Sequence, residues 1–194
     1  QSTGSNTVQC INYTRADGSG IVAGGIDGWA ANGANNDLLP ASASAGIYLG
    51  VSSATASNLL DDYEEGTWAM TVTGASGSFT TGGGEQTCAY TKIGRLVFVQ
   101  GQINITGESS PSGTLKFDLP FTTGSLTQTA DASTFAVDLH AHGGTYAQPK
   151  AFTQQGEAYF RMRYFDTSGA VTLIDEGDVD AGWWFSFGGY QVTS

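Results

Sequence analysis

Four carboxylates lie within five consecutive residues about a third of the way along the chain, at Asp61, Asp62, Glu64 and Glu65. Grouped carboxylates bind calcium, and paired carboxylates hydrolyse glycosidic bonds. Hydrolysis needs two carboxylates that face each other across a sugar, and four on one short segment do not provide that arrangement. We therefore expect a solvated junction, an N-cap or a subunit contact here. Either basic partners or an outward splaying of the carboxylates must relieve the repulsion among these negative charges. The nearest basic residues in sequence are Arg15, Lys92 and Arg95.

Two other clusters contain side chains that bind metals. The run from Asp175 to Gly182 alternates Asp with Gly, but it lacks the EF-hand spacing and the closing Glu, so an acidic hairpin loop is the alternative. His140 and His142 would project from the same face of a strand, but neither a Cys nor a third His is near them in sequence. We expect no bound metal and no cofactor.

Sequence signals for nucleophilic catalysis and for phosphate binding are missing. The glycine run at residues 82–84 is not followed by the Lys-Ser/Thr pair of a phosphate-binding loop, and no Gly-x-Ser-x-Gly elbow occurs. The two cysteines, Cys10 and Cys88, form no Cys/His motif and are interpreted as buried thiols. The chain is therefore predicted not to be an enzyme.

Aromatic residues are the better candidates for binding. Trp183 and Trp184 are adjacent in an expected strand, so they point to opposite faces, one into the core and one toward solvent or a neighbouring chain. An exposed Trp or Tyr stacks well on a sugar and often dominates an interface. We assign Trp183, Trp184 and, in the loop at 143–149, Tyr146 as candidate receptor-binding residues. A core or subunit-interface role is the alternative for each.

The charge balance excludes several partners. Seven Lys and Arg against 18 Asp and Glu give a net charge of −11. Nucleic acids and anionic membranes require a basic surface that replaces counterions, so neither is expected as a partner. No run of about 18 apolar residues is present, so no membrane insertion is expected.

From Thr67 onward, alternating apolar and polar residues predict about eight short strands with regular turns between them. The clearest is 96–106, where Val97, Val99, Ile103 and Ile105 form one face and polar residues the other. Gly101 interrupts the apolar face, where a bulge or a close aromatic neighbour is expected. Further strands are expected at 67–73, 88–93, 115–119, 135–139, 160–164, 170–174 and 183–192, with turns at 74–85 and 107–113. The pattern predicts an all-β, antiparallel sandwich or jelly-roll domain at 59–194.

Residues 1–58 form a glycine-rich segment with scattered apolar residues. One copy would bury too little surface to offset the entropy of ordering it. We therefore predict a β connector that becomes ordered by association, most simply as a trimer. The only helix-permissive stretch is 55–65, with Ser57 or Asn58 as a cap.

Two motifs carry a resemblance to a known family. Residues 60–68 read LDDYEEGTW after GIYLG at 46–50, and residues 90–97 read YTKIGRLV with LPF at 119–121. Together they resemble the C-terminal domain of bacteriophage tail fibre proteins, with Ala69-Met70 where similar sequences commonly have Thr-Pro. The resemblance implies a virion fibre whose trimeric β head attaches to a host surface glycan or protein without chemistry, and which meets other virion proteins on its N-terminal side.

Two other phage functions remain open under this resemblance. One is a capsid-mounted head fibre or decoration protein, and the other is a tailspike that depolymerises glycan. A free secreted carbohydrate-binding module is a further alternative, although it would not need a connector that orders by association. Within the fibre hypothesis, Leu60, Tyr63 and Trp68 are predicted to form a collar where three connectors join three heads.

Overall fold

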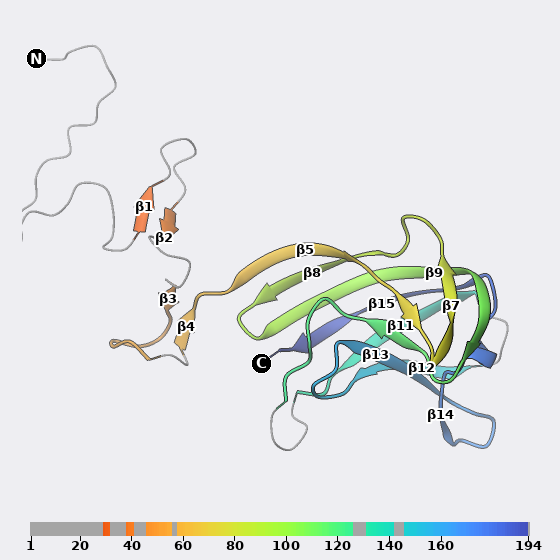
Figure 1. Ribbon diagram of the computed structural model, residues 1–194. Helices are drawn as coiled ribbons and strands as arrows, with labels where there is room; N and C mark the ends of the chain where they lie inside the picture. The colour runs from red at the N-terminus through yellow and green to blue at the C-terminus, as the bar shows by residue number, and fades with distance from the viewer. Residues whose placement is uncertain are drawn as a thin grey trace, which may run out of the picture. The chain divides into compact units, whose positions relative to one another are not determined.

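The computed structural model describes residues 29–31, 38–40, 46–55, 58–125, 131–141 and 146–193. The chain forms two compact units, residues 1–61 and residues 62–194, and we call the second one the head unit. Regular structure in the described residues is almost entirely β-strand (Figure 1). The predicted all-β, antiparallel fold class is confirmed, while the predicted domain boundary between residues 58 and 59 stays a prediction.

The first unit contains two short strand pairs. β1 (Trp29–Ala31) pairs with β2 (Leu38–Pro40), and β3 (Ile47–Tyr48) pairs with β4 (Leu59–Leu60), both antiparallel. In the stretch 55–65, which was expected to permit a helix, Asn58 has 3-10 helical conformation, residues 56–57 lie outside the described residues, and β4 and the start of the next strand follow. Large apolar side chains next to this pair are exposed to solvent: Ile47, Tyr48, Leu49 and Val51.

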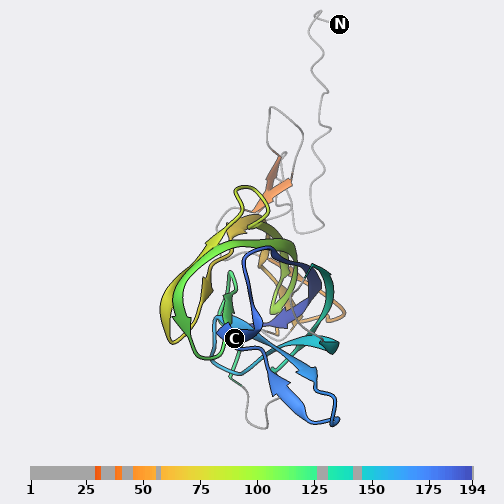
Figure 2. The ribbon, with the colours of Figure 1, turned by 90° about the vertical axis from the view of Figure 1, so that its right-hand side faces the viewer.

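The head unit is one sheet of eleven antiparallel strands with a short 3-10 helix, η2 (Glu176–Asp178). The strands are β5 (Tyr63–Ala69), β6 (Val72–Thr73), β7 (Ser76–Thr81), β8 (Thr87–Ile93), β9 (Leu96–Ser112), β10 (Lys116–Asp118), β11 (Thr134–Ala141), β12 (Ala147–Thr153), β13 (Tyr159–Phe165), β14 (Val171–Leu173) and β15 (Trp183–Val192). Their order is β5-β8-β9-β15-β11-β12-β13-β10-β6, with β7 beside β9 and β14 beside β13. Figure 2 shows how this sheet curls around its core.

The two ends of the strand order are joined by consecutive residues. β5 and β6 are the terminal strands, yet only Met70 and Thr71 separate them in sequence. The Met70 amide donates to Gln86 O at 2.8 Å, beside β8, and the Asp118 amide of β10 donates to Thr71 O at 3.2 Å. The predicted single strand at 67–73 is therefore wrong, because the chain leaves one edge of the sheet at Met70 and joins the other edge.

Alternation along the strands builds the core as the sequence predicted. Val97 and Ile103 of β9 are fully buried, as are Phe117 of β10 and Phe160 of β13. The rings of Phe117 and Phe160 stack at 5.0 Å, and Phe117 also contacts Trp183 of β15 at 6.4 Å between ring centroids. β10 and β13 therefore pack across the core from β15, as the two layers of a sandwich do.

Glycines in the strands lie opposite aromatic rings. Gly101 of β9 pairs with Phe187 of β15, and a Cβ added at Gly101 would overlap the Sγ atom of Cys88. Gly66 of β5 pairs with Tyr90 of β8, whose ring occupies the space of the missing side chain. The close aromatic neighbour predicted for Gly101 is confirmed.

Three stretches expected to be turns or loops contain strands. β7 lies inside the expected turn at 74–85, β9 continues through the expected turn at 107–113, and β12 begins inside the expected loop at 143–149. β7 pairs with the distal half of β9, where Phe79 opposes Glu108. Backbone hydrogen bonds, rather than an apolar face, hold these polar segments in the sheet. Their sequences therefore lack the apolar alternation from which strands are predicted. Within the described ranges, no helix has the length and apolar character needed to cross a membrane.

Candidate functional site

The outer surface of β9 and β15 carries aromatic and amide side chains. Even-numbered residues of both strands point away from the core, because the odd-numbered Val97, Val99, Trp183 and Phe185 point into it. The strand register places these outward residues side by side in rows. We call this surface the aromatic–amide face, and it comprises Phe98, Gln100, Gln102, Asn104, Trp184, Ser186 and Tyr190.

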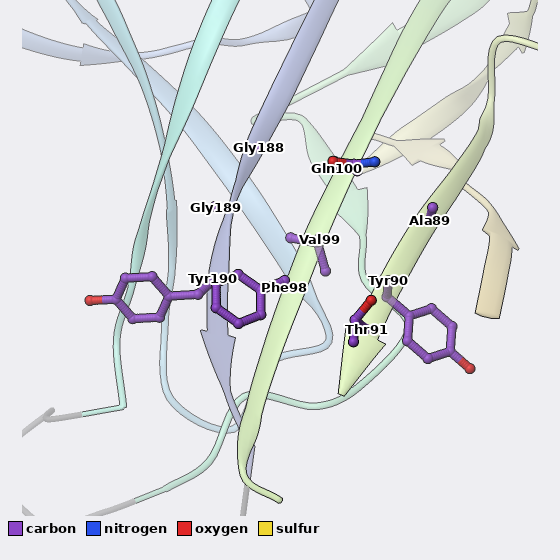
Figure 3. Close-up of a pocket in the computed structure, with 9 residues that line it drawn as sticks. All are labelled: Ala89, Tyr90, Thr91, Phe98, Val99, Gln100, Gly188, Gly189 and Tyr190. Carbon is purple, nitrogen blue, oxygen red and sulfur yellow. The ribbon is translucent and has the colours of Figure 1, made fainter. Parts of the chain in front are cut away.

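A groove of about 310 Å³ opens at one end of this face, between β8, β9 and β15. Phe98 and Tyr190 are directly opposed across the two strands, and each is 50% exposed. Figure 3 shows their rings side by side, with the Tyr90 ring turned away from them. In the next row Gln100 opposes Gly188, which has no side chain to fill the space. The groove is therefore a shallow trough with two exposed rings at one end and an amide beside its floor.

Trp184 lies at the opposite end of the same face. It opposes Asn104, and its indole contacts the His140 ring of β11 in a tilted arrangement at 4.7 Å between centroids. Nε2 of His140 lies 3.0 Å from the Ser186 hydroxyl, which fixes the imidazole beside the indole. Tyr190 is six positions beyond Trp184 along an extended strand, a span of about 20 Å. The face therefore presents exposed rings at both ends of an extended polar strip.

The polar strip between the rings has free hydrogen-bonding capacity. Within the described residues, the side-chain amides of Gln100, Gln102 and Asn104 form no hydrogen bond to protein. Each amide offers both donors and an acceptor. Asp138, which opposes Ser186 from β11, is the neighbouring carboxylate. Rings that stack on apolar faces and amides that bond to hydroxyls are the groups that recognise sugars.

The receptor candidates from the sequence lie in three different environments. Trp184 is 36% exposed on the aromatic–amide face, whereas Trp183 is 1% exposed and packs in the core. Tyr146 lies immediately before β12, its ring contacts Tyr164 at 4.9 Å, and its hydroxyl donates to the backbone oxygen of Asp178. Burial raises the pKa of Tyr146 to about 12. Of the three, Trp184 is the one placed for contact with a large ligand.

The collar candidates have partners within their own units. Leu60 pairs with Ile47 between β4 and β3. The Trp68 ring contacts Tyr90 at 6.3 Å between centroids, and its indole nitrogen donates to Asp118 O at 3.3 Å. Tyr63 is exposed and donates to Glu65, a hydrogen bond that raises the pKa of its hydroxyl. Trp68 therefore helps to hold the edge of the head unit, and the role of all three in a trimer stays a prediction.

Two of the four carboxylates at the acidic junction have partners in β8. Lys92 of β8 forms an ion pair with Asp62, and the Tyr90 hydroxyl donates to Glu64. Arg95, the other nearby basic residue, instead pairs with the buried Asp131 at 3.0 Å. Asp62 and Glu64 thus bond to residues of β8 and help to hold this segment against the sheet.

The remaining candidates from the sequence are the acidic run at 175–182, the two histidines and the two cysteines. In the acidic run, the Asp175 amide donates to the Asp178 carboxylate at 2.9 Å and closes a turn at η2. His142 and Cys10 lie outside the described residues, and in the part of the chain that is described no group of three His, Cys, Asp or Glu side chains converges on a point. Cys88 is buried, and burial raises the pKa of its thiol to about 11.

Sequence reasoning missed most of the aromatic–amide face. Phe98 falls on the polar side of the predicted strand at 96–106, and a large ring at a wet position is the signal that could have identified it. Tyr190 is an even number of positions from Trp184 along the final strand, so both side chains point to the same face of the sheet. The pairing of Phe98 with Tyr190 joins residues far apart in sequence and was not readable from either strand alone.

Comparisons with known proteins give one structural likeness. No family model matches the chain, and no curated protein matches it either. Among solved structures, the crystal structure of the Dettilon tailspike protein (gp208) matches with a TM-score of 0.54 and 21% sequence identity. The match covers 67% of this chain and 24% of the tailspike, so it involves about a quarter of that protein's length. This chain therefore shares the fold of one part of a phage tailspike.

Proposed function

We propose that this chain is a phage virion fibre protein whose head unit attaches to glycan on the host cell surface without cleaving it. The observation that carries the proposal is the aromatic–amide face, where Phe98, Tyr190 and Trp184 are exposed around unpaired amides. The fold likeness to a phage tailspike supports a place in the virion. The motifs at 60–68 and 90–97 support the same assignment.

The chemistry of the face favours sugar over other ligands. A pyranose ring has apolar C–H faces that stack on aromatic rings, and its hydroxyls are donors and acceptors that match amides. Gln100 and Gln102 lie in successive rows between the rings. An extended glycan chain would follow β15 from Tyr190 toward Trp184 along about 20 Å of strand.

Binding to host surface fractions tests this function directly. The full chain is incubated with lipopolysaccharide and capsule fractions purified from the host and is added as a competitor in a phage adsorption assay. We expect binding to at least one glycan fraction and a dose-dependent block of adsorption. Tyr190→Ala should lose both effects, while Tyr48→Ala, an exposed Tyr in the first unit, keeps them. Adsorption that continues unchanged at saturating protein would refute the proposal.

The fibre proposal includes assembly as a homotrimer that joins other virion proteins on its N-terminal side. The support is the cluster of exposed apolar residues in the first unit, at Ile47, Tyr48, Leu49 and Val51. Exposed clusters of this kind mark protein contacts. Native mass spectrometry of the full chain should give three times the mass of one copy, and a stable monomer would overturn the trimer.

A glycan-depolymerising tailspike is the second candidate, favoured by the name of the structural neighbour. Hydrolysis would require a second carboxylate opposite Asp138, because both known geometries use two facing carboxyl groups. Incubation with host polysaccharide followed by an assay for new reducing ends separates the two functions. A head fibre or decoration protein would bind in the same way, and immunogold labelling of virions distinguishes capsid from tail.

A further inference from the structure

The outer side of β10, β12 and β13 concentrates positive charge in a strongly acidic chain. Lys116 of β10, Lys150 of β12, and Arg161 and Arg163 of β13 point away from the core at alternate positions. They are four of only seven Lys and Arg residues in a chain with net charge −11. Figure 1 shows β12 and β13 side by side in the head unit. We call this surface the basic face.

The cations on this face lack neutralising partners. Lys150 and Arg163 are directly opposed across β12 and β13. Like charges at such positions destabilise a sheet. Within the described residues, none of the four cations forms an ion pair. This unfavourable arrangement would be relieved by a bound anion.

A pocket lies at the opposed pair. It has a volume of about 170 Å³ and is lined by Gln148, Lys150, Arg163, Tyr164, Phe165 and Val171. The register of β12 shifts between Ala147 and Lys150, and Gln148 in that bulge has φ of 51°. A non-glycine residue in the left-handed region stores strain, and such residues and bulges concentrate at binding sites. The lining is mostly apolar, so Lys150 and Arg163 contribute mainly their aliphatic stems to the pocket, beside the bulge.

Aromatic rings hold the cations in place. The Arg163 guanidinium lies 4.7 Å from the Phe152 ring centroid. Lys116 and Arg161 lie 4.8 Å and 5.0 Å from the same Tyr159 ring, so they are within about 10 Å of each other, a separation over which salt does not fully screen charge. Arg161 already donates to Gln154 and, at 2.7 Å, to the Tyr159 hydroxyl, whereas the stacked Arg163 keeps its N–H groups available in a fixed plane for a carboxylate. The face is therefore partly organised before any ligand arrives.

The carboxylates near this face have other partners. Glu157 hydrogen-bonds to the hydroxyl of Tyr159, the ring that Lys116 and Arg161 contact. Asp166 follows β13, and its carboxylate accepts from the Ser168 amide at 2.8 Å and the Ala170 amide at 3.0 Å, which closes the β13–β14 turn. Asp118 of β10 accepts from the Thr71 amide at the seam between the sheet edges. None of the three is an ion-pair partner of Lys150 or Arg163.

We propose that the basic face is a second glycan subsite, specific for acidic sugars, in which Lys150 and Arg163 bind the carboxylate of a uronic acid unit. The apolar side of the pocket, at Phe165 and Val171, contacts the sugar ring, and Lys116 and Arg161 add only long-range attraction for the next charged units of the polymer. The identification of the ligand as a glycan rests on the proposed function. The presence of an anion site rests on the basic face alone.

A defined pair of ligands tests the subsite on the full chain. Tetragalacturonate is titrated calorimetrically at low and at physiological salt, and its fully methyl-esterified form is the neutral match. We expect the acid to bind, salt to weaken it, and the ester to bind at least tenfold more weakly. Lys150→Gln and Arg163→Gln should each weaken the acid about tenfold or more, since each removes a charge-assisted hydrogen bond. Arg163→Lys should recover part of the loss.

Matched variants keep the outcome interpretable. Lys116→Gln removes the same charge from the same face outside the pocket and should cost much less than Arg163→Gln. Equal losses from the two would mean diffuse charge attraction and would overturn the built subsite. Equal binding of acid and ester, or wild-type binding by Arg163→Gln, would overturn it too. Thermal melts of each variant confirm that the fold is intact.

Three other experimental results would each indicate a different ligand for the basic face, and each would contradict the proposal. Equal affinity for a short DNA duplex would indicate a general polyanion site, and binding of sulfate or phosphate as strong as that of tetragalacturonate would indicate a free-anion site. Loss of oligomer mass in Arg163→Gln, without any binding of tetragalacturonate, would indicate a contact with a second copy. Tyr48→Ala, in the first unit, should leave the binding of tetragalacturonate unchanged. A protein that binds tetragalacturonate but does not block phage adsorption contradicts the fibre proposal alone, and one that blocks adsorption without binding tetragalacturonate contradicts this subsite alone.

Discussion

On one side of the head unit the outward positions of β9 and β15 carry rings and amides, and on another those of β12 and β13 carry cations. Both surfaces cover the same core, where Phe117 and Phe160 stack beneath them. β9 and β15 pair in unbroken register for ten residues, whereas β12 is bulged at Gln148. The comparison teaches that inward positions are constrained by packing, while outward positions are free to differ in chemistry between strands of one sheet.

Removing the Phe117 ring, which lies in the core beneath both surfaces, should destabilise both of them together. Phe117→Ala leaves a cavity against Phe160, Trp183 and Phe185, and we expect the free energy of unfolding to fall by about 3–5 kcal/mol. Urea denaturation measures it. Phe98→Ala is the matched control, because that ring is half exposed and should cost far less. Similar losses from the two variants would mean that the core is not shared as described.

Alkaline pH should weaken the layer beneath the aromatic–amide face. Burial raises the Cys88 pKa from 9.0 to about 11, so the folded state keeps a proton that the unfolded state loses. Stability contributed by the protonated thiol is therefore lost as pH rises from about 9 to about 11, by at most roughly 2–3 kcal/mol. Cys88→Ala should show a smaller decline in the free energy of unfolding over this range. An identical decline in both proteins would assign the effect to other groups.

Filling the groove should separate the two surfaces functionally. A Cβ at Gly188 would have its nearest neighbour, Val99 O, at 3.9 Å, so the side chain added in Gly188→Val starts in open space and extends into the trough. We expect host glycan binding to weaken at least about tenfold, or 1.4 kcal/mol, with stability nearly unchanged. Gly177→Val, at another open position, is the control and should bind normally. Normal binding by Gly188→Val would remove the groove from the site.

The smallest effect should appear in the stability of the basic face itself. Arg163→Gln removes one member of the opposed like-charge pair with Lys150, so we expect a gain of about 0.2–1 kcal/mol in the absence of ligand. Differential scanning calorimetry at low salt measures it, and the gain should shrink as salt screens the repulsion. A loss of stability would show that the Arg163 stack on Phe152 outweighs the repulsion.

The sequence predicted the inward half of this molecule better than the outward half. The alternation of Val97, Val99, Ile103 and Ile105 identified the central strand and its buried face, because the core accepts only apolar side chains there. β7 and β12 were missed because their stability comes from backbone pairing, and residues such as Ser76 or Lys150 carry no sign of it.

The candidate sites depend on neighbours that are distant in sequence. Phe98 meets Tyr190 and Lys150 meets Arg163 only because of strand order and register, which one sequence does not encode in a readable pattern. The prediction that Trp183 and Trp184 face opposite ways is confirmed, because adjacent strand residues must do so, but the sequence left open which of the two faces outward. The neighbouring ring of His140 lies at a bulge in β11, and the alternation of apolar and polar residues does not reveal such a bulge.

The central position of β15 has a consequence for biosynthesis. β9 is complete at Ser112, but its long partner begins at Trp183. At a translation rate of about 5–20 residues per second, β9 emerges roughly 4–14 s before β15 can pair with it. During that interval the ribosome-bound chain exposes an unpaired strand edge that another nascent copy could occupy. Synthesis of several copies on one messenger thus carries a risk of exchange between chains, which ends when β15 pairs with β9 of its own chain.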